Sequence, residues 1–383
     1  MKVQHRRKSR SFVLPMAAGA TAATLAIGGV LLFSREVRDA PEGRVDARQS
    51  APAPARIECA ESGRVAGSGS TAQQNAVKHW IKEYQRACPG VRIAYRPIGS
   101  GAGVAQFLRG ATAFGGTDGA LKPDDVEWSR KVCPGGRAID LPMVGGPVAI
   151  GYNLPDVSDL VLDAPTLAKI YDSRITRWDD PAIRKLNPGA ELPGSEIRAV
   201  HRSDESGTTQ NLNAYLAEAA PREWPYAADK AWQARGGHSG NGSDGVVAEV
   251  KSTPGSLGYF ELSFAEAGKI PTVRIDTGAA EPVEASPETA SVGIAAAEVV
   301  GEGKDLSLKL DYGTSADGAY PIALVAYEIV CDRGNDPMTL PALKSFLSYT
   351  AGEEGQKLLP SIHYAPLPES VAVRVREIIR TLS

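Results

Sequence analysis

Apolar residues recur along the chain at two spacings, and the two spacings alternate. Within residues 77–84, 104–108 and 212–216 they fall three and four positions apart, which places them on one face of a helix. Short apolar runs at 91–95 and 197–200 precede the last two of these segments, as expected of strands. The first helical face is made of Val77, Trp80, Ile81 and Tyr84. Strands that alternate with helices predict an α/β fold.

Longer patterns extend this prediction toward the C-terminus. Residues 141–152 form a long apolar strand or crossover, and residues 320–331 form another strand. Residues 163–186 predict short helices that end at the turn 187–189. The last helix carries one apolar stripe, made of Val371, Val375, Ile378 and Leu382.

The N-terminal pattern differs from the rest of the chain. Residues 1–10 carry five basic side chains and no acid, and residues 11–33 are apolar and uncharged. This apolar segment is longer than the core of a usual cleaved signal, and it predicts a signal anchor whose basic flank stays in the cytoplasm. A cleaved signal peptide is the alternative. Residues 34–58, rich in Ala, Pro and Arg, predict a solvated linker.

Composition excludes several classes of protein. The net charge of the 383 residues is −3, which gives no general attraction to nucleic acid. A hydrophobic fraction of 43% is that of a globular protein. The few cysteines and histidines show no zinc-ligand spacing, so neither a metal nor another cofactor is expected.

An even number of cysteines outside the cytoplasm predicts disulfides. Cys88 and Cys133 each precede Pro-Gly after a predicted helix, which favours pairing them and leaves Cys59 with Cys331. Four cysteines allow three pairings, and four buried free thiols are the remaining alternative.

Three turns rich in Gly, Ser and Thr, at 67–71, 98–103 and 201–208, each lead into a helix. Helix starts expose unpaired N–H groups and partial positive charge, and so favour anions. Each turn alone is explained by helix capping. Three turns in one chain, one of them carrying Arg202, predict convergence on one oxyanion.

Residues 114–118 end in Asp118, an acid where an anion is expected. A carboxylate accepts a hydrogen bond from a protonated oxyanion such as hydrogen phosphate, but it repels fully ionised sulfate. At 4 Å and an effective dielectric constant of 20, this repulsion is about 4 kcal/mol. Asp118 is therefore expected to select among anions.

In these stretches the sequence resembles the phosphate-specific substrate-binding proteins of Pst-type ABC importers. The resemblance covers about residues 62–375 and includes further matches at 175–180, 186–189, 242–245 and 254–259. It implies a two-lobed periplasmic-binding-protein fold of type II-like architecture, with the ligand cleft between the lobes. The implied lobes are 59–145 plus 321–383, and 146–320.

The resemblance also implies roles for individual residues. Asp118 would accept the phosphate proton, and Arg202 would bind the charge with Asp204 behind it. The implied hydrogen-bond donors are Thr71, Ala72, Ser100, Ser206, Gly207 and Thr208. Two positions depart from the family pattern: Ala72 stands where Phe is frequent, and Glu205 stands where Gly is common.

The leading hypothesis is a receptor, not an enzyme, that binds inorganic phosphate at the extracytoplasmic face of the cell membrane and delivers it to the membrane subunits of an ABC permease. One rival is the same fold binding another oxyanion or acting as a surface sensor. A second rival is a hydrolase using Ser206, but the Gly-x-Ser-x-Gly pattern of a nucleophile elbow is not met, since Asp204 and Thr208 occupy the Gly positions. His201, the nearest base in sequence, is expected to be a packed or exposed side chain.

Overall fold

The computed structural model describes residues 57–383. The predicted basic region 1–10, the apolar segment 11–33 and nearly all of the linker 34–58 lie outside the described residues. In the described part, no helix combines the length and the apolar character needed to span a membrane.

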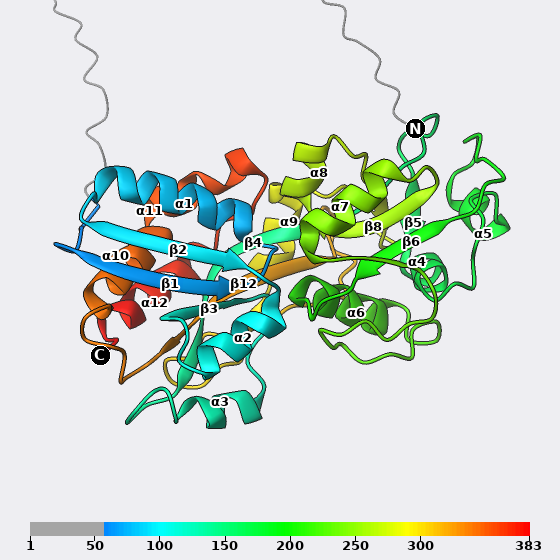
Figure 1. The fold of residues 1–383 in the computed structure, drawn as a ribbon. Helices are drawn as coiled ribbons and strands as arrows, with labels where there is room; N and C mark the ends of the chain where they lie inside the picture. Colours follow the sequence, from blue (N-terminus) through cyan, green and yellow to red (C-terminus); the bar gives the residue numbers. More distant parts are fainter. Residues whose placement is uncertain (1–56) are drawn as a thin grey trace, which may run out of the picture. The chain divides into compact units, whose positions relative to one another are not determined.

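One eight-stranded sheet organises these residues, with the strand order β2-β1-β3-β12-β4-β8-β6-β7 (Figure 1). Its strands are β1 (Gly63–Gly69), β2 (Val91–Pro97), β3 (Phe114–Thr117), β4 (Ala138–Tyr152), β6 (Arg198–Arg202), β7 (His238–Gly240), β8 (Ser256–Glu261) and β12 (Ala323–Cys331). Two small two-stranded sheets pair β5 (Val161–Asp163) with β9 (Arg274–Asp276) and β10 (Glu298–Val299) with β11 (Leu308–Lys309).

Helices connect and cover these strands. They are α1 (Gln74–Ala87), α2 (Ser100–Leu108), α3 (Pro123–Ser129), α4 (Ala164–Tyr171), α5 (Pro181–Leu186), α6 (Gly207–Ala219), α7 (Gly242–Ser252), α8 (Leu262–Gly268), α9 (Pro287–Ala295), α10 (Leu340–Thr350), α11 (Glu353–Lys357) and α12 (Glu369–Arg380), with the 3-10 helix Leu359–Ile362 before α12. The alternation of strands and helices confirms the predicted α/β class.

Strand β4 belongs to both halves of the sheet. Its residues 138–147 pair antiparallel with β12, and its residues 148–152 pair antiparallel with β8. The pairing with β12 shifts register between Ala326 and Tyr327, so Met143 is left out of the ladder. One continuous strand therefore joins a half built on β1, β2 and β3 to a half built on β6, β7 and β8.

The parallel strands of each half end at a common edge. In the first half β1 is parallel to β2 and β3, and in the second half β6 is parallel to β7 and β8. Ligands of open α/β sheets bind outside the carboxyl ends of such strands. A ligand-binding site is therefore expected at these six strand ends.

The apolar spacing predicts the buried helix faces closely. Val77, Trp80 and Tyr84 of α1 are fully buried, and Ile81 is half-buried. The stripe of α12 is displaced at one position, because Ile379 is buried there and the predicted Ile378 is only half-buried.

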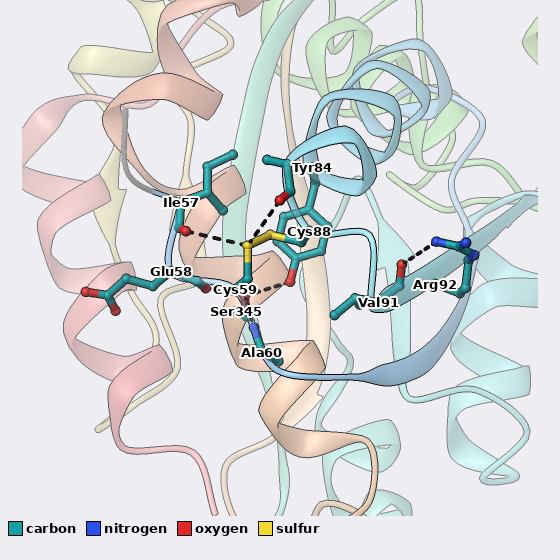
Figure 2. Close-up of a disulfide and its surroundings, with 10 residues drawn as sticks. Ile57, Glu58, Cys59, Ala60, Tyr84, Cys88, Val91, Arg92 and Ser345 are labelled. Carbon is teal, nitrogen blue, oxygen red and sulfur yellow. Dashed lines mark hydrogen bonds between the residues drawn. A yellow bond between two sulfur atoms is a disulfide. The ribbon is translucent and has the colours of Figure 1, made fainter. Parts of the chain in front are cut away.

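All four cysteines form disulfides, but the predicted pairing is wrong. The bonds join Cys59 to Cys88 and Cys133 to Cys331. The segment before β1 lies beside the end of α1, because β1 and β2 are parallel neighbours, and this brings Cys59 to Cys88 (Figure 2). In the second pair, Cys331 ends β12 opposite Ala138 at the start of β4, five residues after Cys133. The order of the strands in the sheet decides both cysteine pairs, and this order cannot be inferred from the local Pro-Gly turns.

Candidate functional site

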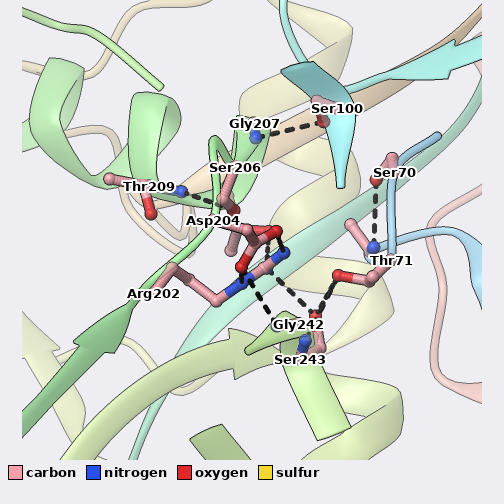
Figure 3. Close-up of polar contacts among 12 residues, drawn as sticks. Ser70, Thr71, Ser100, Arg202, Asp204, Ser206, Gly207, Thr209, Gly242 and Ser243 are labelled. Atoms are coloured by element: carbon pink, nitrogen blue, oxygen red, sulfur yellow. Dashed lines mark hydrogen bonds and ion pairs between the residues drawn. The ribbon is translucent and has the colours of Figure 1, made fainter. Parts of the chain in front are cut away.

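Residues from all six parallel strand ends meet in one polar cluster. Thr71 follows β1, Ser100 follows β2 and Asp118 follows β3 in the first half of the sheet. In the second half, Arg202 ends β6, Ser243 follows β7 and Glu261 ends β8. Hydrogen bonds connect the two halves, as when Gly207 N–H donates to Ser100 Oγ at 3.1 Å (Figure 3).

Arg202 is the cation of this cluster, and it is only 2% exposed. Its Nε donates to Asp204 Oδ1 at 2.8 Å and its Nη2 donates to Asp204 Oδ2 at 2.5 Å, a bidentate pair. Gly242 N–H also donates to Asp204 Oδ1 at 3.0 Å. Burial would raise the pKa of Asp204, but the hydrogen bonds and charge of Arg202 outweigh it and lower that pKa. The carboxylate thus stays ionised and orients the guanidinium.

Asp118 is the acid of the cluster, and it is buried. Its Oδ2 accepts a hydrogen bond from Ser100 Oγ at 3.2 Å, whereas its Oδ1 has no hydrogen-bond partner among residues 57–383. Burial, followed by the charge of Glu261, raises the pKa of Asp118 to about 7. A buried oxygen of this kind is a strong acceptor for a proton brought by a ligand.

Ser243 and Glu261 are site residues to which the sequence assigned no role. Ser243 Oγ lies 2.9 Å from Thr71 Oγ1, and it donates to Glu261 Oε2 at 3.0 Å. Thr208 Oγ1 donates to Glu261 Oε1 at 2.7 Å. Arg202 Nη1 faces both hydroxyls, 3.5 Å from Thr208 and 3.4 Å from Ser243. Glu261 could have been predicted as a site residue because it ends a strand, as Arg202 does. That prediction requires knowing that these two strands are parallel neighbours in the sheet.

The remaining predicted donors lie in the same region. Ala72 N–H, the donor expected at the position where Phe is frequent, donates to Ser70 Oγ at 2.9 Å, and its contact with an anion stays a prediction. Ser206 Oγ accepts from Thr209 N–H at 3.2 Å and caps α6, which leaves its own proton available to donate (Figure 3).

Glu205, the second departure, is exposed and lies against the start of α2. Its carbonyl oxygen accepts a hydrogen bond from Gly101 N–H at 3.0 Å. A Cβ placed on Gly101 would lie 2.5 Å from the Glu205 Cβ, so the two halves approach at a distance that requires glycine.

The hydrolase alternative receives no support from the geometry. The His201 ring stacks on Trp232, with centroids 4.8 Å apart, and its Nδ1 lies 3.0 Å from the Arg202 carbonyl oxygen. Within residues 57–383 no hydrogen bond joins His201 to Ser206. In the same range no group of His, Cys, Asp and Glu could hold a metal ion.

Three comparisons place this geometry among known proteins. The model of the PBP superfamily domain matches residues 53–354. The phosphate-binding protein PstS 3 of Mycobacterium tuberculosis is 39% identical over 368 residues, which cover 95% of this chain and 98% of that protein. Its namesake in Mycobacterium leprae is 40% identical over 360 residues, or 93% and 96% of the two chains.

A solved phosphate-binding protein from Stenotrophomonas maltophilia resembles the chain in fold. The TM-score is 0.65 at 17% sequence identity, and the match covers 82% of this chain and 94% of that one.

Proposed function

Since the chain belongs to the PBP superfamily and, within it, to the PstS phosphate-binding proteins, we propose that it is an extracytoplasmic receptor for inorganic phosphate. In this role it carries phosphate to the membrane subunits of an ABC permease and catalyses no reaction. Turnover of a phosphate ester by the purified protein would contradict this proposal.

One observation carries the choice of ligand: among residues 57–383 the buried Asp118 Oδ1 has no hydrogen-bond partner, and it lies in the same cluster as Arg202. A cation beside a lone acceptor suits an oxyanion that carries both negative charge and a proton. Hydrogen phosphate has both, and sulfate lacks the proton. The proposed donors to the anion are the hydroxyl or backbone N–H groups of Thr71, Ala72, Ser100, Ser206, Gly207 and Thr208. Ser100 and Gly207, which donate to Asp118 and to Ser100 in this structure, would turn to the anion when it binds.

Isothermal titration of the full chain with phosphate, arsenate and sulfate tests the proposal. Phosphate and arsenate are expected to bind, and sulfate is expected to bind about a thousandfold more weakly, because its repulsion by Asp118 is about 4 kcal/mol. Tight sulfate binding without phosphate binding would favour the reading of the same fold as a receptor for another oxyanion.

Substitution of Asp118 tests the source of the selectivity. Asp118→Asn removes the negative charge and adds two amide protons, so it is expected to bind sulfate measurably while binding phosphate less tightly. Persistent exclusion of sulfate by this variant would show that another group selects the anion.

We further propose that the site lies between two lobes, 59–145 plus 321–383 and 146–320, that close on the ligand by a hinge near Gly145 and Tyr320. The shared strand β4 and the position of the cluster between the two sets of strand ends support this arrangement. A phosphate-dependent decrease in the radius of gyration in solution scattering is expected.

The N-terminal segment 11–33 is proposed to anchor the receptor in the cell membrane, with 34–58 as its linker. The expected outcome is an intact N-terminus in protein recovered from membranes. Recovery of chains that begin after residue 33 would indicate cleavage and secretion instead.

A further inference from the structure

Three hydroxyl groups and one carboxylate form a connected network on one side of the site. Thr208 and Ser243 each donate to a different oxygen of Glu261, at 2.7 and 3.0 Å. Because the only hydroxyl proton of Ser243 is donated to Glu261, Thr71 Oγ1 is the donor in its 2.9 Å hydrogen bond with Ser243 Oγ. Ser243 N–H donates in turn to Thr71 Oγ1 at 3.2 Å.

All hydroxyl protons of this network are used within it. The three hydroxyls supply three protons, and these make the bonds from Thr208 to Glu261, from Ser243 to Glu261 and from Thr71 to Ser243. The hydroxyls of Thr71, Thr208 and Ser243 therefore turn lone pairs toward the site. Lone pairs suit Arg202 Nη1, which faces two of these hydroxyls, but they repel an anion.

One additional proton changes the count. A protonated Glu261 donates to Ser243 or to Thr208, and the hydroxyl that receives this bond can turn its own proton outward. If Ser243 receives it, Ser243 can donate to Thr71 and release the proton of Thr71. Either route leaves one hydroxyl donor facing the anion.

We propose that Glu261 is a positioning residue that sets the number of hydroxyl protons facing the anion, and that phosphate binding is accompanied by uptake of one solvent proton at Glu261. This inference rests on the proposed phosphate-binding function. It adds a proton that Asp118 does not account for, because Asp118 accepts the proton that phosphate itself carries.

The charges around Glu261 agree with this proposal. Arg202 from β6 is balanced by Asp204, so Asp118 and Glu261 are two further acids in a buried region, and an anion adds negative charge. Burial raises the pKa of Glu261, although Thr208 and Arg202 oppose the shift. Tyr364 also faces Glu261, and its phenol stays neutral because burial and the Glu261 charge raise its pKa.

The test compares the full-length wild-type chain with Glu261→Gln. An amide donates to one hydroxyl and accepts from the other, so this variant keeps the donor count of protonated Glu261 without titrating. Titration with inorganic phosphate in buffers of different ionisation enthalpy gives the protons taken up at each pH. In the pH range where Glu261 is ionised in the free wild type, the wild type is expected to take up nearly one proton more on binding phosphate than Glu261→Gln does. In that range the phosphate affinity of the wild type should also fall about tenfold more per pH unit than that of the variant.

Equal proton uptake by the two proteins at every pH between about 5 and 9 would overturn the proposal. Glu261→Ala is the matched control: it removes both acceptors, which frees the protons of Thr208 and Ser243, so it should bind phosphate at least as tightly as Glu261→Gln. If instead Glu261→Ala binds phosphate more weakly than Glu261→Gln, Glu261 has only a structural role.

Infrared difference spectra keep the proposal testable if Glu261→Gln does not fold. At about pH 8, above the pKa of about 7 of Asp118, phosphate should produce a carboxylic acid band in the wild type that persists in Asp118→Asn. Phosphate binding without such a band would overturn the proposal. Absence of any phosphate binding by the wild type would instead overturn the proposed function itself.

Discussion

At the scale of single residues, Arg202 and Asp118 have opposite charges and, in the proposed receptor, complementary roles. Arg202 is held ionised and oriented by Asp204, and it supplies attraction for any anion. Asp118 has a buried oxygen with no partner in the described part of the chain, which suits a ligand that brings a proton. A buried acid with a strongly raised pKa costs stability, and such acids are frequent at functional sites.

Burial of the Asp118 carboxylate predicts that the stability of the phosphate-free protein depends on pH. Its pKa of about 7 in the folded protein exceeds its ordinary value of 3.8, so the folded state binds more protons than the unfolded state between these values. The free energy of unfolding should therefore decrease as pH rises from about 4 to 7, by up to about 4 kcal/mol from this residue.

In Asp118→Asn the free energy of unfolding should no longer contain the decrease that Asp118 causes. Chemical denaturation of the wild type and the variant at about pH 5 and pH 8 would measure the difference. Asp124→Asn on the exposed start of α3 is the control and should leave the pH dependence unchanged. A variant that loses as much stability as the wild type over this range would show that Asp118 is not the source. Asp140, also buried with a pKa of about 7, would then be the next candidate.

At the scale of elements, the beginning of α2 meets the turn before α6 across the site. Gly101 N–H donates to the Glu205 carbonyl oxygen, and the Glu205 side chain occupies the space where a Cβ of residue 101 would lie. This contact joins the two halves of the sheet next to Ser100 and Gly207. A glycine in α2 thus permits the close approach that the site requires.

Gly101→Ala is expected to weaken phosphate binding by roughly one to two orders of magnitude, because overpacking of this kind costs about 1–3 kcal/mol. Calorimetric titration would measure the loss. Adding Glu205→Gly removes the opposing Cβ and should restore much of the affinity. Failure of this second change to rescue binding would mean that the clash lies elsewhere. Gly313→Ala is a suitable control, since the nearest atoms to its Cβ would belong to the side chains of Glu218, at 3.2 and 3.6 Å, and Asp311, at 3.7 Å.

Elements were the level best predicted from the sequence, because helix faces follow from local spacing. The buried face of α1 and the strands β2, β4 and β12 agree with their apolar patterns. The candidate residues in Gly-Ser-Thr turns were also found, since helix starts have local signatures. Ser243, Glu261 and the disulfide pairing were not found, because each depends on which strands are neighbours. Nothing local to Glu261 reports that β8 lies beside β6.

At the scale of the whole molecule, the two disulfides constrain the unfolded chain unequally. The cysteines of one bond are 29 residues apart in sequence, and those of the other are 198 apart. In the chain-entropy model these loops contribute about 3.5 and about 5 kcal/mol to the free energy of unfolding.

Replacing each pair by serine should therefore lower the melting temperature in both cases, and more strongly for Cys133 and Cys331. Calorimetry of the two double variants tests this order. Phosphate binding should persist in both, since neither bond touches the cluster around Arg202. A larger loss from the pair Cys59 and Cys88 would mean that native contacts near the bond, such as Tyr84 with Ser345, outweigh the loop entropy.

Strand β4 runs through both halves of the sheet and carries its one irregularity at Met143, next to Gly145 and Gly146. A ladder interrupted at a single position can flex there while its bonds on either side stay made. In the proposed hinge motion, opening would then break few main-chain hydrogen bonds. The balance between open and closed receptor would be decided by the side chains that meet across the cleft, so changes such as Gly101→Ala should tune ligand release without unfolding either lobe.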